Sequence, residues 1–201
     1  MRIILVSLVL ALCGCETITQ DDFSIARMES ASVSDNEMGV LSTILMFQDE
    51  GMQTITSAED ISRILAYTLR AYHEHFGHVP SMPRDLVVME LRENSSQWLF
   101  ICDDSPNDSL HVDGCSDYSG RLFPHSIADI SADWEIALPS RIYQRGPIVS
   151  AGVFVHEMIH GLLAMDGHDD YDHVTPGVWE HDAGSVYHRV LDMMIEDGWQ
   201  G

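Results

Sequence analysis

Residues 153–162 read Val-Phe-Val-His-Glu-Met-Ile-His-Gly-Leu, and this stretch decides the fold. Apart from His156, Glu157 and His160, its residues are uncharged and mostly apolar. An apolar segment of this kind is typical of a helix that is buried inside a small domain. We therefore expect a buried helix over about 147–165 that carries two imidazoles and one carboxylate into the protein interior.

The spacing of the three polar residues predicts a metal site. His156 and His160 are four residues apart, so on a helix their imidazoles project from one face and can share one Zn²⁺. Glu157 is rotated by about 100° from His156, because a helix has about 3.6 residues per turn. Its carboxylate is thus expected beside the metal, where a general base takes a proton from zinc-bound water.

The third ligand must come from the sequence that follows the helix. A catalytic zinc site takes three protein ligands and keeps one position open. Gly167 is expected to end the helix in a left-handed conformation, so that the next residues run back over the metal face. Four residues near this turn are candidates for the third ligand: Asp166, His168, His173 and Glu180. Asp170 or Asp172 has a different expected role, which is to accept a hydrogen bond from the ring N–H of a ligand histidine.

Together these features resemble the zincin class of zinc metallopeptidases. The stretch from Gly167 to Trp179 is similar to a Gly-x-x-Asp-x-x-His-x-x-Pro-x-aromatic pattern in poorly characterised, predicted metallopeptidases among bacterial lipoproteins, with two residues in place of one between Pro176 and Trp179. The likeness covers about 134–180 and implies that His173 is the third zinc ligand. Glu180 stands where thermolysin-like enzymes have their third zinc ligand, and Asp166 stands where one small relative of the metzincins has an aspartate. Both therefore remain alternatives.

A second His-rich stretch is expected to be a decoy. Residues 73–78 read His-Glu-His-Phe-Gly-His, and Gly77 stands where the second histidine of a metal-binding pair is needed. We interpret this stretch as the frayed end of a helix, with weak surface metal binding at most.

The remaining patterns predict one α+β, zincin-like domain over 54–201, with a small mixed or antiparallel sheet and a C-terminal helix. Ser57 and Asp60 have the spacing of a capping box and predict a helix over 58–76. Strands are predicted over 86–91, 97–102 and 134–138, and the last is expected at a sheet edge because it ends at Pro139. A helix is predicted over 176–196, with Thr175 as its N-cap. Residues 15–53 are interpreted as a tether and a short segment, with a possible helix over 38–47.

The N-terminus predicts export and a lipid anchor. Residues 3–12 form an apolar run of ten, too short for the roughly 20 residues of a membrane-spanning helix. The sequence Leu12-Cys13-Gly14-Cys15 resembles the bacterial lipoprotein signal, which implies that residues 1–14 are removed and that Cys15 is lipidated. The residue after Cys15 is Glu16 and not Asp, and we therefore expect the protein at the outer membrane of the bacterial cell envelope.

Cysteine usage and charge extend this prediction. Cys102 and Cys115 are the two cysteines left for pairing in an oxidising compartment, so a disulfide between them is expected.

Ten basic residues, all arginine, stand against 32 acidic ones, for a formal net charge of −22. This balance argues against nucleic acid as a partner, because phosphate binding needs clusters of Lys and Arg.

The function expected from these residues is that of a lipid-anchored zinc endopeptidase. Its partners are a peptide or protein substrate, extended along the strand over 134–138, and the membrane that holds the anchor. Tyr171, Tyr187 and His181 are candidates to stabilise the oxyanion. The alternatives are a non-catalytic, zinc-stabilised lipoprotein that acts as adaptor or inhibitor, and a metal-storage or delivery protein. Glu157 favours the enzyme over the first alternative, which does not need a carboxylate at that position. The second alternative does not explain the uncharged residues around the motif.

Overall fold

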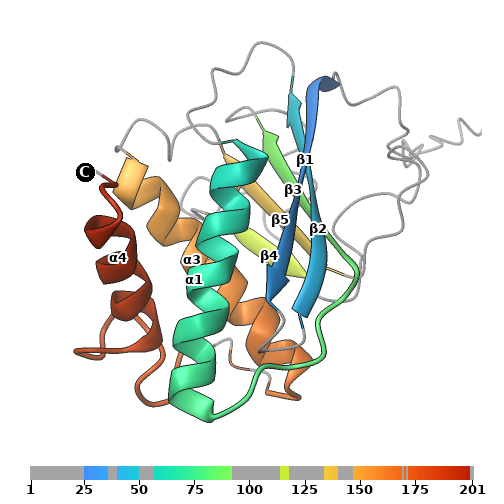
Figure 1. The fold of residues 1–201 in the computed structure, drawn as a ribbon. Coiled ribbons are helices and arrows are strands. Elements are labelled where there is room, and N and C mark those ends of the chain that lie inside the picture. The colour runs from blue at the N-terminus through green and yellow to red at the C-terminus, as the bar shows by residue number, and fades with distance from the viewer. Residues whose placement is uncertain are drawn as a thin grey trace, which may run out of the picture.

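The computed structural model describes residues 25–35, 40–49, 57–91, 114–117, 134–139, 147–168, 170 and 172–199. Within them, a five-stranded mixed sheet carries helices on one face, which confirms the predicted α+β class (Figure 1). The predicted signal peptide, Cys15, Cys102 and the strand over 97–102 lie outside the described residues. The disulfide between Cys102 and Cys115 therefore stays a prediction.

The sheet has the strand order β1-β2-β3-β5-β4. The strands are β1 (Ile25–Asp35), β2 (Val40–Asp49), β3 (Asp85–Leu91), β4 (Cys115–Asp117) and β5 (Trp134–Pro139). The pairs β1–β2 and β4–β5 are antiparallel, whereas β2–β3 and β3–β5 are parallel. The chain therefore crosses over the sheet between β2 and β3, and helix α1 makes this crossover.

The N-terminal part of the sheet corrects two expectations. Strands β1 and β2 pair antiparallel and β2 pairs with β3, so residues 25–35 and 40–49 are not a tether and residues 40–47 are not helical. Alternate residues of β2, from Ser42 through Ile44 and Met46 to Gln48, are buried. Phe47 on the opposite face is buried as well, and the buried face includes the polar Ser42 and Gln48, so the sequence does not alternate regularly between apolar and polar residues.

Helix α1 (Ala58–Phe76) confirms the predicted helix and its capping box. The Ser57 side chain accepts a hydrogen bond from the backbone N–H of Asp60, and the Asp60 carboxylate accepts one from the backbone N–H of Ser57. The helix ends at Gly77, whose φ of 79° is left-handed. Both ends are thus defined locally, and the apolar side of the helix packs on the sheet and on the other two described helices.

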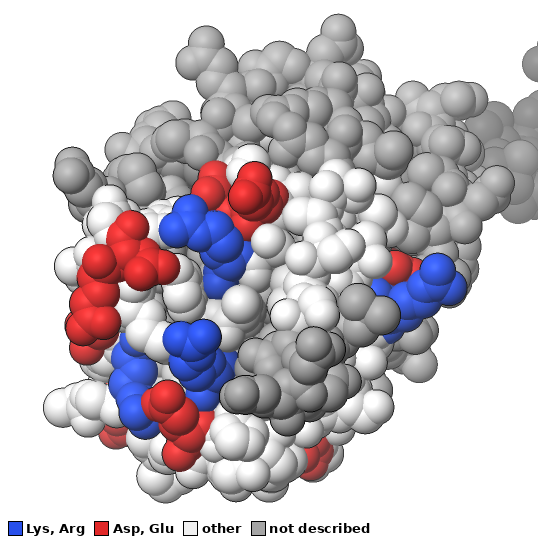
Figure 2. Space-filling model, viewed as in Figure 1, with Lys and Arg blue, Asp and Glu red and all other residues white. Residues whose placement is uncertain are grey.

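Arginines join α1 to the C-terminal helix α4 (Val186–Glu196) on the face shown in Figure 2. Arg63 pairs with Asp60 and Asp197, and Arg189 pairs with Glu74. Blue and red side chains are accordingly interspersed over this face. Exposed pairs of this kind each contribute little to stability, so the packing between the two helices depends mainly on their buried apolar residues.

Helix α3 (Pro147–Met165) confirms the predicted buried helix. Its segment Ile148–Met165 is apolar enough to cross a membrane by length and composition alone, yet 61% of that segment is buried inside the described structure. The helix lies against β5, where Gly161 faces the fully buried Trp134. A Cβ at Gly161 would collide with the Trp134 indole, so the glycine permits the close approach of helix and strand beside His160.

Strand β5 confirms the strand predicted over 134–138, but the prediction that it lies at a sheet edge is wrong. β3 pairs with it on one side and β4 on the other. Pro139 is the last residue of the strand, so its missing N–H ends the ladder without requiring an edge position. Among the described strands, β4 ends the sheet on this side.

The last helix begins later than predicted. Residues 175–184 form turns, and α4 starts after Ser185, whose side chain accepts a hydrogen bond from the backbone N–H of His188. Gly177 and Gly184 have φ values of 71° and 70°, which a right-handed helix does not accommodate. These two glycines thus explain why Thr175 and Pro176 do not open a helix.

The contact between Gly161 and Trp134 predicts the sign of a stability change. Alanine at a helix position normally stabilises relative to glycine by about 1 kcal/mol. We expect Gly161→Ala instead to lower the free energy of unfolding by about 1–3 kcal/mol, because the buried indole has no space to move into. Denaturant unfolding measures this change. Ala164→Leu, at an exposed position of the same helix, is the control and should change stability by less than about 0.5 kcal/mol. A stabilised Gly161→Ala protein would contradict the proposed packing.

Candidate metal centre

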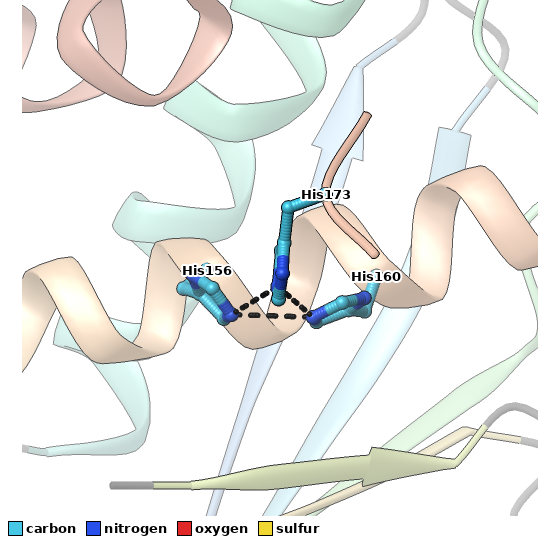
Figure 3. Close-up of side chains that lie close together, drawn as sticks. All are labelled: His156, His160 and His173. Atoms are coloured by element: carbon cyan, nitrogen blue, oxygen red, sulfur yellow. Dashed lines mark hydrogen bonds between the residues drawn. The ribbon is translucent and has the colours of Figure 1, made fainter. Parts of the chain in front are cut away.

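Three histidines meet above the middle of helix α3 (Figure 3). His156 and His160 project from neighbouring turns of the helix, and His173 reaches them from the loop that follows it. The Nε2 atoms lie 3.2 Å apart between His156 and His160, 3.1 Å between His156 and His173, and 3.0 Å between His160 and His173. The structure therefore brings together the three residues that the sequence analysis proposed as ligands.

The arrangement of these nitrogens fits a metal ion. Nitrogen ligands about 2.0–2.1 Å from a tetrahedral ion are about 3.3 Å from one another, close to the observed spacing. Hydrogen bonds alone do not satisfy the triangle, because each Nε2 is either protonated or bare. Of three such atoms at least two are in the same state, so at least one contact places two donors or two acceptors face to face. A cation that accepts all three lone pairs removes this conflict.

Burial keeps the first two imidazoles in the form that binds metal. It lowers the pKa of His156, although the neighbouring Glu180 carboxylate opposes the change. It lowers the pKa of His160 to about 4, and the adjacent His156 and His173 rings add to this effect. Both side chains are therefore neutral near pH 7, as ligation of a metal requires.

Glu180 contacts the opposite ring nitrogen of His156. Its carboxylate lies 3.4 Å from Nδ1, whereas the triad is formed by Nε2. Glu180, an alternative third ligand, is therefore placed to orient His156 by accepting its N–H, the role that sequence analysis gave to Asp170 or Asp172. Asp172 is exposed, and Asp170 has other partners.

Asp166 and His168 are not part of the triad. The Asp166 carboxylate accepts a hydrogen bond from the Tyr72 hydroxyl at 2.9 Å and lies 2.9 Å from Nε2 of His78. His78 belongs to the stretch interpreted as a frayed helix end, and here it ties the end of α1 to the end of α3. His168 is exposed. Among the described residues, His156, His160 and His173 form the one group with ligand atoms this close.

The loop that carries His173 is held by Asp170. This buried carboxylate accepts hydrogen bonds from the backbone N–H groups of Val174 at 2.8 Å and Thr175 at 2.9 Å, and from Trp179 Nε1 at 2.7 Å. Burial alone would raise the pKa of Asp170, but these hydrogen bonds outweigh it and hold the pKa below its usual range. Within this turn His173 has a φ of 55°, a left-handed conformation that a non-glycine residue keeps only where its surroundings impose it.

The Trp179 ring packs against all three imidazoles of the triad. The ring is fully buried, and its centroid lies 5.2 Å from that of His156, 4.6 Å from that of His160 and 4.4 Å from that of His173. Because its indole N–H also binds Asp170, one side chain supports all three imidazoles and the loop. The sequence pattern includes Trp179 as its aromatic end but does not predict this contact.

Glu157 lies beside the triad and is 6% exposed. Burial raises its pKa to about 8. Gly114, just before β4, packs against it so closely that a Cβ on the glycine would lie 2.7 Å from Glu157 Oε1. His156 and Glu157 border a cleft of about 470 Å³ that also contains Glu180 and Tyr187. A buried carboxylate and one imidazole of the triad thus border the same open space.

Of the three residues expected to stabilise the oxyanion, one lines the cleft. Tyr187 lines the cleft, and burial, together with the Glu180 carboxylate, raises its pKa. Its hydroxyl therefore stays protonated near pH 7 and is able to donate a hydrogen bond into the cleft. His181 is exposed, and Tyr171 lies outside the described residues.

No protein-family model, curated protein or solved structure matches this chain. The likeness to the zincin class therefore depends on the helix motif and on the three histidines that the fold brings together.

The hydrogen bonds of Asp170 predict how the loop controls metal binding. We expect Asp170→Asn to weaken Zn²⁺ affinity by about 10–100-fold, because an amide cannot accept all three hydrogen bonds and His173 loses its support. Competition with a chromogenic chelator measures the affinity. Asp172→Asn removes an exposed carboxylate from the same loop and should leave the affinity nearly unchanged. Equal affinities for Asp170→Asn and the unaltered protein would show that the loop does not depend on this carboxylate.

Proposed function

We propose that this protein is a zinc-dependent endopeptidase. The observation that carries the proposal is the convergence of His156, His160 and His173, with His156 and the buried Glu157 at the wall of an open cleft. Imidazole is the ligand type that zinc commonly takes in proteins, and three protein ligands are the number found in its catalytic sites. When bound, zinc supplies Lewis-acid activation of water and of the scissile carbonyl.

The protein's own residues supply proton transfer and orientation. Glu157, buried next to His156, takes a proton from the attacking water and later gives it to the leaving amine. Tyr187 donates a hydrogen bond from its protonated hydroxyl to the developing oxyanion. Glu180 holds His156 through Nδ1 and keeps its Nε2 directed at the metal position.

The sheet determines where a substrate lies. Because β5 is paired on both sides, it has no free backbone groups to pair with a peptide. We therefore place the substrate beside β4 and not beside β5. Gly114 leads from Glu157 directly into β4. Among the described strands β4 is the last on this side, and an extended peptide added beside it would therefore pass the general base.

A non-catalytic zinc site is the second candidate. Structural zinc sites are almost always closed by four protein ligands. In the described part of the chain, the group holds three ligands and adjoins a cleft, which favours catalysis. Storage or delivery of metal does not require Glu157 to be buried beside the ligands.

Substitutions in the site separate these candidates. We expect Glu157→Gln to keep stoichiometric zinc, measured by plasma emission, while cleavage of an unbiased peptide mixture falls by about 10²–10⁴-fold, because only the base is lost. His173→Ala should lose zinc. If His173→Ala keeps zinc and Glu180→Ala loses it, the third ligand is Glu180. Undiminished cleavage by Glu157→Gln would exclude the mechanism and favour a zinc-stabilised lipoprotein.

The proposed location is the bacterial outer membrane, with the protein held by acyl chains on Cys15. The support is the lipoprotein-like sequence around Cys15, since residues 1–24 lie outside the described structure. Intact mass spectrometry of the native protein should show a mature chain that begins at Cys15 and carries two or three acyl groups. A mature form without acyl mass would contradict the anchor.

A further inference from the structure

The cleft beside the metal centre continues well beyond the reacting groups. The described residues that line it are Gly114, Ile148, Val149, Gly152, Val153, His156, Glu157, Glu180, Tyr187 and Leu191. We propose that this cleft binds a large apolar side chain next to the scissile bond, and that Val149 and Leu191 help to determine this specificity. The inference rests on the proposed function, because it names the class of substrate for that site.

The walls of the cleft are apolar on two sides. Ile148, Val149 and Val153 come from the first turns of α3, and Leu191 comes from the middle of α4. The two helices pack against each other, so the apolar walls are parts of a formed surface. Its volume, about 470 Å³, lies within the range of roughly 300–1,000 Å³ that is usual for small-ligand sites.

Gly152 and Tyr187 close the wall between these helices. A Cβ on Gly152 would lie 2.5 Å from the Tyr187 hydroxyl oxygen, so the absence of a side chain there allows the tyrosine to pack directly on α3. Gly152 also precedes His156 by about one helical turn. The closed part of the cleft is therefore next to the first ligand, and a side chain that fills the cleft brings its own backbone to the metal centre.

The charges around the cleft disfavour an acidic side chain. Its ionisable lining residues are two acids, one histidine and one tyrosine, and none of the described lining residues is Lys or Arg. Glu180, the more exposed acid, lies beside His156. Val149 is 43% exposed, one of three large hydrophobic residues exposed to this degree among those described. An apolar occupant would cover this valine, whereas a carboxylate would face Glu180 and would find no Lys or Arg among the described lining residues.

Binding of metal-anchored ligands tests the specificity without catalysis. The probes are short peptide hydroxamates that bind the zinc-loaded protein through the hydroxamate and differ in one adjacent side chain, Leu, Ala or Asp. We expect Leu to bind about 10–100-fold more tightly than Ala in calorimetry, and Asp to bind most weakly. Equal affinities for the three probes, or preference for an otherwise identical Arg probe over Leu, would overturn the proposal.

A charge placed in the cleft provides the matched variant. We expect Val149→Lys to reduce the preference for Leu over Asp by at least about tenfold, since the ammonium would attract the carboxylate and disturb the apolar wall. Ile195→Lys makes the same change at the exposed Ile195 of α4, outside the lining residues, and should retain the original order. Zinc content shows that both variants keep the metal centre. An unchanged preference in Val149→Lys would refute the role of Val149.

The two proposals fail in different ways. If the probes bind in the expected order but no peptide is cleaved, the cleft specificity stands and the endopeptidase proposal fails. If peptides are cleaved with no enrichment of large apolar residues on either side of the scissile bond, the protein is a peptidase and the cleft proposal fails.

Discussion

Three imidazole nitrogens within 3.2 Å of one another are the constraint on which the rest of the structure depends. Two of them are fixed by the period of one helix, but the third comes from a loop and must be brought to the same point. Asp170 does this by accepting three hydrogen bonds, and it holds His173 in a left-handed conformation that costs on the order of 1–3 kcal/mol. The loop is therefore as much a part of the site as the helix.

The site and the hydrophobic core share side chains. Trp179 is fully buried among core residues and contacts all three imidazoles, while Trp134 packs on Gly161, the residue next to His160. A metal ion on the triad would therefore stabilise the packing of α3 against the loop, because it binds only where these elements are already together. Conversely, a change in core packing near Gly161 would shift the His triad without altering any of its three histidines.

Local signals explain which parts of the fold were predictable. The capping box of Ser57 and the apolar stretch around His156 each determine an element within a few residues, and both helices appeared where predicted. Strand β2 was missed because its buried face carries the polar Ser42 and Gln48 while Phe47 is buried on the other face, and β1 was missed because its apolar residues are scattered in a polar stretch. The edge position assigned to β5 was wrong because pairing with β4 is a long-range contact that Pro139 does not reveal.

The same distinction holds within the site. His173 was identified by likeness to a pattern, whereas the contact of Glu180 with Nδ1 of His156 required the turns around Gly177 and Gly184, whose left-handed conformations end the helix expected there. Those turns free Glu180 from a helix surface and place it against the ligand. A carboxylate on the far nitrogen of an imidazole makes Nε2 a better donor to a cation. The departure from the predicted helix thus gives the centre the outer partner that an imidazole site needs.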